Sequence, residues 1–169
     1  ELQNVCSKLF KISPDETLKI TQELYEKKLV TYPRTDARVL STAVAKEIYK
    51  NIGDLRNYQP LAEAAAEILE KKSWQGIGKS RYTNDKQITD HYAIIPTGQG
   101  FGALRSVSQT GQVVYELIVR RFLSIFYPPA VYQKAALVTC MGTEKFFANF
   151  RILMEEGYLK IAPKALAVK

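Results

Sequence analysis

TGQVVYELIVRRFLSIFYPPAVY, residues 110–132, contains the change of periodicity that decides the fold class. Apolar residues first recur at helical spacing, which predicts one long helix capped by Thr110 and running to about Tyr127. Pro128 and Pro129 end this helix, because proline has no backbone N–H to donate. The residues that follow show the alternation of strands. The sequence therefore predicts an α+β fold, mainly α, with a boundary at the two prolines.

Two strand-like segments follow this boundary. Residues 132–140 and 145–153 are rich in aromatic and β-branched side chains, which is typical of β-strands. Between them lies Met141-Gly142-Thr143-Glu144, a turn-like sequence that predicts a hairpin. A last short strand is expected at residues 157–161.

Upstream of the long helix the signals are mostly helical. Ser13-Pro14-Asp15-Glu16 combines an N-cap serine with proline at the first helical position, so a helix should begin there and run to about Lys28. Other helices are expected before it at residues 2–9, after an N-cap at Ser41, and at residues 60–72. Residues 73–102 hold five glycines and should be mostly loop.

Composition limits the class of protein. The 169 residues carry a net charge of +7 and are 46% hydrophobic, enough for a folded core and favourable for a polyanionic partner. We find no run of apolar residues long enough for a membrane span and no signal peptide, so a cytoplasmic protein without membrane contact is expected. The two cysteines, Cys6 and Cys140, lack metal-type spacing and are expected to be small buried apolar residues.

Residues 29–36, Leu-Val-Thr-Tyr-Pro-Arg-Thr-Asp, place a phenol, a guanidinium and a carboxylate close together. Residues 29–32 form a short apolar and β-branched run, expected to be a strand, that Pro33 ends. A phenol is protonated at neutral pH and is a poor nucleophile unless a nearby cation stabilises the phenolate. Arg34 could provide that cation or bind a phosphate with its planar fork, and Asp36 could orient Arg34. On local chemistry alone, a tyrosine at the end of a strand is usually a half-buried packing residue, and an arginine two positions later is usually a surface ion-pair partner.

Thr31-Tyr32-Pro33-Arg34-Thr35-Asp36 resembles the active-site motif of type IA DNA topoisomerases. A second stretch, Asp90 to Thr97 (Asp-His-Tyr-Ala-Ile-Ile-Pro-Thr), holds the sole histidine, His91, and resembles the second motif of that family. The likeness covers nearly the whole chain. The proline after the tyrosine and the form of the histidine motif are closer to the topoisomerase III branch.

The resemblance implies a role for each matching residue. Tyr32 would attack one DNA strand and form a 5′-phosphotyrosine link, while Arg34 and His91 would contact the scissile phosphate. Asp36 and Thr35 would support them, and Arg120 is a weaker candidate for binding DNA. No ATP would be needed, because the covalent link keeps the phosphodiester energy. One departure is Ala37, where the family often has serine or cysteine.

The resemblance also implies what lies elsewhere. Family members bind Mg²⁺ through an acidic cluster in a separate toprim domain, and no closely spaced set of carboxylates is present here, so no metal ligand is predicted. We expect a piece of a longer enzyme that is inactive alone and works with DNA, especially single-stranded DNA, and with the remaining domains. Residues 1–130 would form a helical, winged-helix or CAP-like tyrosine domain, and residues 131–169 part of an antiparallel β arch.

The sequence leaves three other interpretations of the function open. A non-catalytic winged-helix DNA-binding module would also combine capped helices, a hairpin and positive charge. A tyrosine recombinase would need several arginines and histidines converging on the phosphate, and only one histidine exists. A protein-interaction module would leave both motifs unexplained.

Overall fold

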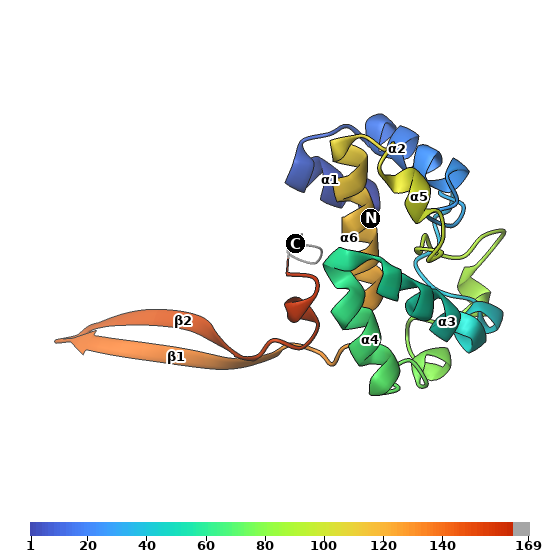
Figure 1. Ribbon diagram of the computed structural model, residues 1–169. Helices are drawn as coiled ribbons and strands as arrows, with labels where there is room; N and C mark the ends of the chain where they lie inside the picture. Colours follow the sequence, from blue (N-terminus) through green and yellow to red (C-terminus); the bar gives the residue numbers. More distant parts are fainter. Residues whose placement is uncertain (164–169) are drawn as a thin grey trace.

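The computed structural model describes residues 1–163 and shows a helical body from which one long β-hairpin extends (Figure 1). Most described residues before Val131 lie in helices or in the loops between them. The only sheet among residues 1–163 is two-stranded and antiparallel. The predicted α+β class, mainly α, is confirmed.

The helices follow the predicted order along the chain. Short 3₁₀ turns lie at Leu55–Asn57, Gln59–Leu61, Ile77–Lys79 and Asp85–Gln87. The segment from Ser73 to Gly100 is otherwise irregular, as its glycines predict. The α-helices are α1 (Leu2–Phe10), α2 (Pro14–Glu26), α3 (Thr42–Asp54), α4 (Ala62–Glu70), α5 (Phe101–Leu104) and α6 (Gln109–Ser124).

Hydroxyl groups cap three of these helices. Ser13 Oγ accepts a hydrogen bond from the Glu16 N–H at 3.1 Å, and Ser41 Oγ accepts one from Val44 at 3.2 Å, so both predicted caps are confirmed. The predicted cap of α6 was wrong. Ser108 caps this helix, because its Oγ reaches the Gly111 N–H at 3.1 Å, and Thr110 lies inside the first turn.

The hydrophobic core surrounds α6, which runs through the middle of the body (Figure 1). Its side of the core includes Val114, Tyr115, Val119 and Leu123, all fully buried. Helix α2 packs against α6 and also against α1, while α3 and α4 pack together. Burial of each large apolar side chain contributes roughly 1.5–3 kcal/mol to the stability of the fold. The packing around α6 therefore holds the neighbouring helices, and the loops that connect them, in place.

Strands β1 (Val131–Met141) and β2 (Glu144–Glu155) form the hairpin. Gly142 adopts a positive φ of 61° in the connecting turn, a conformation that glycine reaches without strain. The predicted hairpin is confirmed, with strands slightly longer than expected. The strand predicted at residues 157–161 was wrong: Gly157–Lys160 is a 3₁₀ helix, since the Tyr158 N–H bonds the Pro128 carbonyl at 2.9 Å and turns the chain back onto the body.

Residues directly opposite one another in the hairpin share a face, because side chains alternate along each strand. The apolar face carries Gln133, Ala135, Leu137, Thr139 and Met141 of β1 with Glu144, Phe146, Ala148, Phe150 and Ile152 of β2. The basic face carries Tyr132, Lys134, Ala136, Val138 and Cys140 of β1 with Lys145, Phe147, Asn149, Arg151 and Leu153 of β2.

The two cysteines have different environments. Cys6 is fully buried, and this burial raises the pKa of its thiol to about 11. Cys140 is exposed on β1, so its predicted burial was wrong. Its apolar neighbours suggested a core position, but in the described structure the hairpin has no covering layer.

Within residues 1–163, none of the helices combines the length and the apolar character needed to cross a membrane.

Candidate functional site

The two motifs singled out in the sequence lie side by side. The Thr31 N–H bonds the Ile95 carbonyl at 3.0 Å, and the Thr97 N–H bonds the Leu29 carbonyl at 3.0 Å. The strand predicted at residues 29–32 is reduced to a single bridge, Val30 to Pro96. Proline donates no hydrogen bond, and Pro33 and Pro96 therefore stop the pairing from extending into a ladder.

Two threonine hydroxyls add to this backbone pairing. Thr31 Oγ1 donates to the Ala93 carbonyl at 3.2 Å and accepts from the Ile95 N–H at 2.9 Å. Thr35 Oγ1 donates to the His91 carbonyl at 2.9 Å and accepts from the Ala37 N–H at 3.1 Å. The Thr35 hydroxyl thus links the backbone of the Tyr32 loop, at Ala37, to the backbone of the second motif, at His91.

Tyr32 and His91 come into direct contact. Their ring centroids are 4.3 Å apart with an interplanar angle of 37°. Tyr32 is half-buried and His91 is exposed, so this aromatic pair borders solvent. The contact joins residues that are far apart in the chain, and it places an imidazole beside the phenol.

Tyr25 completes a row of three rings. It lies in the last turn of α2, and its ring meets Tyr32 edge to face, with centroids 5.4 Å apart and an angle of 86°. The Tyr25 side chain is not part of the core, because 39% of its surface is exposed. Sequence reasoning missed its place in the site. The available signal was its position at the end of the helix that leads directly into the Tyr32 motif.

Arg34 and Asp36, which follow Tyr32 in the same loop, are both exposed. Among residues 1–163, no hydrogen bond or ion pair engages the Arg34 guanidinium or the Tyr32 hydroxyl, so both groups are available to an incoming ligand. Asp36 pairs with neither Arg34 nor His91 in the same part of the chain. Its suggested role in orienting Arg34 therefore stays a prediction.

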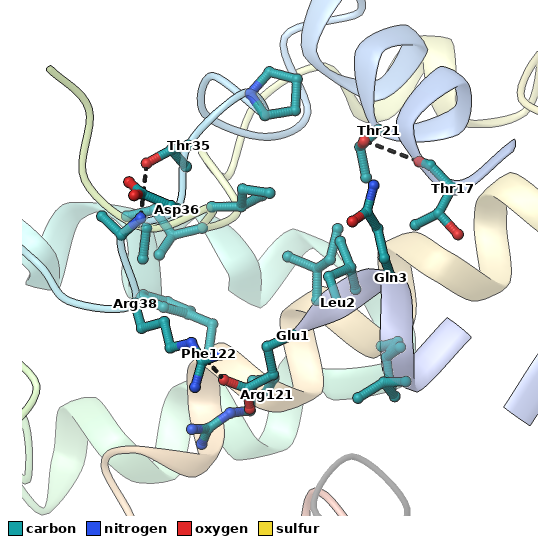
Figure 2. Close-up of a pocket in the computed structure, with 18 of the residues that line it drawn as sticks. Glu1, Leu2, Gln3, Thr17, Thr21, Thr35, Asp36, Arg38, Arg121 and Phe122 are labelled. Carbon is teal, nitrogen blue, oxygen red and sulfur yellow. Dashed lines mark hydrogen bonds and ion pairs between the residues drawn. The ribbon is translucent and has the colours of Figure 1, made fainter. Parts of the chain in front are cut away.

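A groove of about 680 Å³ lies along the same loop (Figure 2). Thr35, Asp36 and Arg38 form one side of it, and Arg38 pairs with Glu1 at 3.6 Å. Helices α1, α2 and α6 contribute the opposite side, which is mostly apolar. Arg34 also lines the groove, whereas Tyr32 and His91 do not. The groove therefore adjoins the aromatic pair without containing it.

Comparison with known proteins assigns this arrangement to a family. A family model described as DNA topoisomerase matches residues 1–168. The chain belongs to this family. It is 36% identical over 160 residues to DNA topoisomerase 3 of Bacillus licheniformis, 35% over 161 residues to that of Bacillus subtilis, and 32% over 164 residues to that of Bacillus thuringiensis. The resemblance to type IA topoisomerases of the topoisomerase III branch is confirmed.

This topoisomerase chain spans about a fifth of the length of those relatives. The matches cover 94% of the chain but only 21% of the Bacillus licheniformis and Bacillus subtilis proteins. The aligned region includes Tyr32, His91 and the loops that bring them together. What the whole enzymes do is therefore a matter of proposal for this chain.

Arg120 lies on α6 with its guanidinium already engaged. It donates to Glu116 Oε1 at 2.7 Å and to the Ile161 carbonyl at 3.0 Å. These contacts tie α6 to the segment that follows the hairpin. They favour a structural role for Arg120, and its predicted contact with DNA stays a prediction.

Potential metal ligands do not gather into a cluster in the described part of this topoisomerase chain. Within residues 1–163, no group of three or more histidine, cysteine, aspartate or glutamate side chains lies close enough together to hold a metal ion. Mg²⁺ needs several oxygen ligands in octahedral geometry. Asp36, four positions after Tyr32 in the same motif, supplies a single carboxylate.

Proposed function

We propose that this chain is the tyrosine-bearing part of a type IA topoisomerase that breaks and rejoins single DNA strands. The Tyr32 phenolic oxygen loses its proton and attacks a backbone phosphorus. A bond forms between this oxygen and phosphorus, the bond from phosphorus to the 3′-oxygen breaks, and that oxygen leaves with a proton as a hydroxyl. Reversal reseals the strand without ATP, because one phosphodiester is exchanged for another.

The contact between Tyr32 and His91 carries this proposal. Two segments separated in the sequence are joined by backbone pairing and by the Thr35 hydroxyl, and their rings meet at 4.3 Å at the surface. A buried packing tyrosine would not need an exposed histidine beside it. A preorganised pair of this kind supports catalysis, since little reorganisation is needed when substrate arrives.

The side chains around the pair suit a phosphate. The exposed Arg34 guanidinium can bind two nonbridging oxygens with parallel hydrogen bonds, and it can stabilise the negative charge that develops on them. His91 can donate a hydrogen bond to the same group. Asp36 is proposed to orient these donors once the phosphate has drawn Arg34 inward.

The domain organisation that the family implies is also part of this proposal. Residues 1–130 are proposed to be a winged-helix-like tyrosine domain, and residues 131–169, of which 164–169 lie outside the described residues, to be part of a β arch. The hairpin projects away from the helices (Figure 1). This supports its assignment to a β arch in preference to the wing of a winged-helix module. We propose that Mg²⁺ is held by residues outside this chain, in a cytoplasmic enzyme that needs its other domains for activity.

Covalent trapping with an intact enzyme that contains this chain tests the proposal. Single-stranded DNA labelled at its 3′ end is mixed with the enzyme, which is then denatured. A 5′-phosphotyrosine link leaves the 3′ label on the protein, whereas a tyrosine recombinase would retain a 5′ label.

Tyr32→Phe should abolish the adduct, and Tyr25→Phe is the matched control that should retain it. An adduct that persists in Tyr32→Phe, or that carries only the 5′ label, would contradict the proposal. Binding of DNA with no adduct in any variant would favour the non-catalytic binding module.

A further inference from the structure

The two faces of the hairpin differ sharply in charge. On the basic face, Lys134 lies directly opposite Arg151, and Lys145 lies farther along the same face. No acidic residue occupies the paired positions of this face from Tyr132 to Cys140 or from Lys145 to Leu153. Glu144, at the turn, belongs to the apolar face. The positive charge is therefore concentrated on one side of the sheet.

Two aromatic rings lie next to these cations along the strands. Along β2, Lys145, Phe147, Asn149 and Arg151 follow one another at every second position, about 6.8 Å apart. Phe147 is 73% exposed and Tyr132 is 46% exposed. Phe147 thus presents a free surface between Lys145 and Arg151, and Tyr132 lies next to Lys134 on the same face.

This arrangement is unfavourable without a partner. Like charges directly opposite each other destabilise a pair of strands, and large exposed apolar side chains are costly in water. Within residues 1–163, none of Lys134, Lys145 and Arg151 takes part in an ion pair, so the charge of this face is not neutralised in the described structure. A polyanion with flat apolar groups would remove both costs.

We propose that the basic face of the hairpin binds single-stranded DNA, with Lys134, Lys145 and Arg151 on the phosphates and Phe147 and Tyr132 stacked on bases. Cations beside exposed aromatic rings form the usual platform for single strands. Duplex DNA hides its base faces, and an acidic protein surface offers nothing to stack on Phe147. Single-stranded DNA therefore fits both properties of the face.

This contact would lie apart from the Tyr32 site, because the hairpin extends away from the helical body (Figure 1). It does not depend on the chemistry of Tyr32. A topoisomerase that binds a DNA strand at two separate sites can retain the strand while one of the sites releases it. The basic face of the hairpin would be the second of these binding sites.

Phe146 and Phe147 provide a matched test, since they are neighbours on opposite faces and both are exposed. Binding of a fluorescent oligothymidylate of about 20 nucleotides to this chain is followed by anisotropy at low salt. Phe147→Leu should weaken binding about fivefold or more, and Phe146→Leu by less than about twofold. Equal effects of the two substitutions, or no effect of Phe147→Leu, would overturn the proposal.

Charge removal gives a second, independent readout. The double variant Lys134→Gln, Arg151→Gln should weaken binding and lower the slope of log affinity against log salt by about 1.4, since each phosphate contact on single strands contributes ~0.7. The control Lys8→Gln, Lys46→Gln removes the same charge from α1 and α3, where both lysines are exposed. An equal loss of slope in the control would show nonspecific attraction and refute the site.

Photocrosslinking locates the bound strand. An oligonucleotide carrying iodouracil should crosslink to Phe147 or Tyr132, as peptide mapping would show, and Tyr32→Phe should leave this crosslink unchanged. Crosslinks confined to residues 1–130 would overturn the hairpin site. Because adduct trapping reports on Tyr32 and crosslinking reports on the hairpin, failure of either proposal is distinguishable from failure of the other.

Discussion

The Thr35 hydroxyl donates a hydrogen bond to the carbonyl oxygen of His91 at 2.9 Å, across 56 positions of sequence. The Thr35 hydroxyl oxygen also accepts a hydrogen bond from the Ala37 N–H. This one side chain therefore holds the Tyr32 loop in shape and joins it to the histidine loop. The His91 ring contacts the Tyr32 ring, with the two centroids 4.3 Å apart. The position of the imidazole therefore depends on a residue that reaches neither the phenol nor the phosphate.

Replacing Thr35 by valine keeps the shape of the side chain but removes its hydrogen bonds. We expect a loss of about 1 kcal/mol in the free energy of unfolding, measured by denaturant titration. In the intact enzyme, adduct formation should slow on the order of tenfold to a hundredfold, because His91 and Tyr32 lose their alignment. Thr35→Ser should restore both, and a valine variant with unchanged adduct formation would contradict the positioning role.

Tyr25 should influence Tyr32 through ring contact. Tyr25→Ala removes the edge-to-face pair, and we expect adduct formation to slow roughly twofold to tenfold, since such a pair is worth about 0.5–1.5 kcal/mol. Tyr25→Phe keeps the ring and should react at the normal rate. Time courses of adduct formation would measure both variants. Equal slowing by alanine and phenylalanine would implicate the Tyr25 hydroxyl in place of the ring.

Gly100 should not tolerate a side chain. Its φ is 77°, and an added Cβ would overlap the carbonyl oxygen of Lys27 at the end of α2. Gly100→Ala should destabilise the chain by more than about 1 kcal/mol, measured by thermal unfolding. Gly102→Ala is the control, because a Cβ there has no atom within 4 Å, and it should be neutral or stabilising by about 0.5 kcal/mol. A similar loss in both variants would refute the steric explanation.

Asp85 should make stability depend on acid pH. Its carboxylate accepts hydrogen bonds from the Thr42 hydroxyl at 2.6 Å and the Thr42 N–H at 2.8 Å, and these bonds lower the pKa of Asp85. The contribution is present above the unfolded pKa, near 4, and is lost as pH falls through the lower folded value. Asp85→Asn should lower the unfolding midpoint at neutral pH, and the two proteins should converge in acid. A constant difference down to the lowest pH would contradict this.

The two cysteines should differ in reactivity. The Cys6 thiol is buried and its pKa is raised to about 11, so almost none of it is thiolate at neutral pH. Cys140 is exposed on the hairpin. Maleimide labelling of the native chain, followed by mass spectrometry, should modify Cys140 and leave Cys6 free until denaturant is added. Rapid labelling of Cys6 under native conditions would show that α1 opens readily.

Local signals predicted the helices and the hairpin well, because each depends on neighbouring residues. Ser13 and Ser41 cap their helices through an N–H three residues ahead, and α6 ends at Ser124, before the two prolines and a little short of its predicted end at about Tyr127. Local signals failed where distant contacts decide the outcome. Residues 157–160 form a 3₁₀ helix because Tyr158 bonds Pro128, and Cys140 is exposed because nothing covers its strand in the described structure.

The candidate site shows the same division. Tyr32, Arg34 and His91 were named from two motifs, since residue type and local order are visible in a sequence. That Tyr25 joins them and that Arg120 is engaged elsewhere had no comparable signal, because both depend on how α2 and α6 sit in the folded body.

By itself, the sequence determined which residues could do chemistry and roughly where most of the helices and the hairpin lie, since both follow from side-chain type and short-range hydrogen bonding. Only the tertiary structure decided that the Tyr32 and His91 loops meet and that the hairpin carries its positive charge on one face. Those outcomes depend on packing around α6 and on strand register, which bring together residues that no local pattern relates.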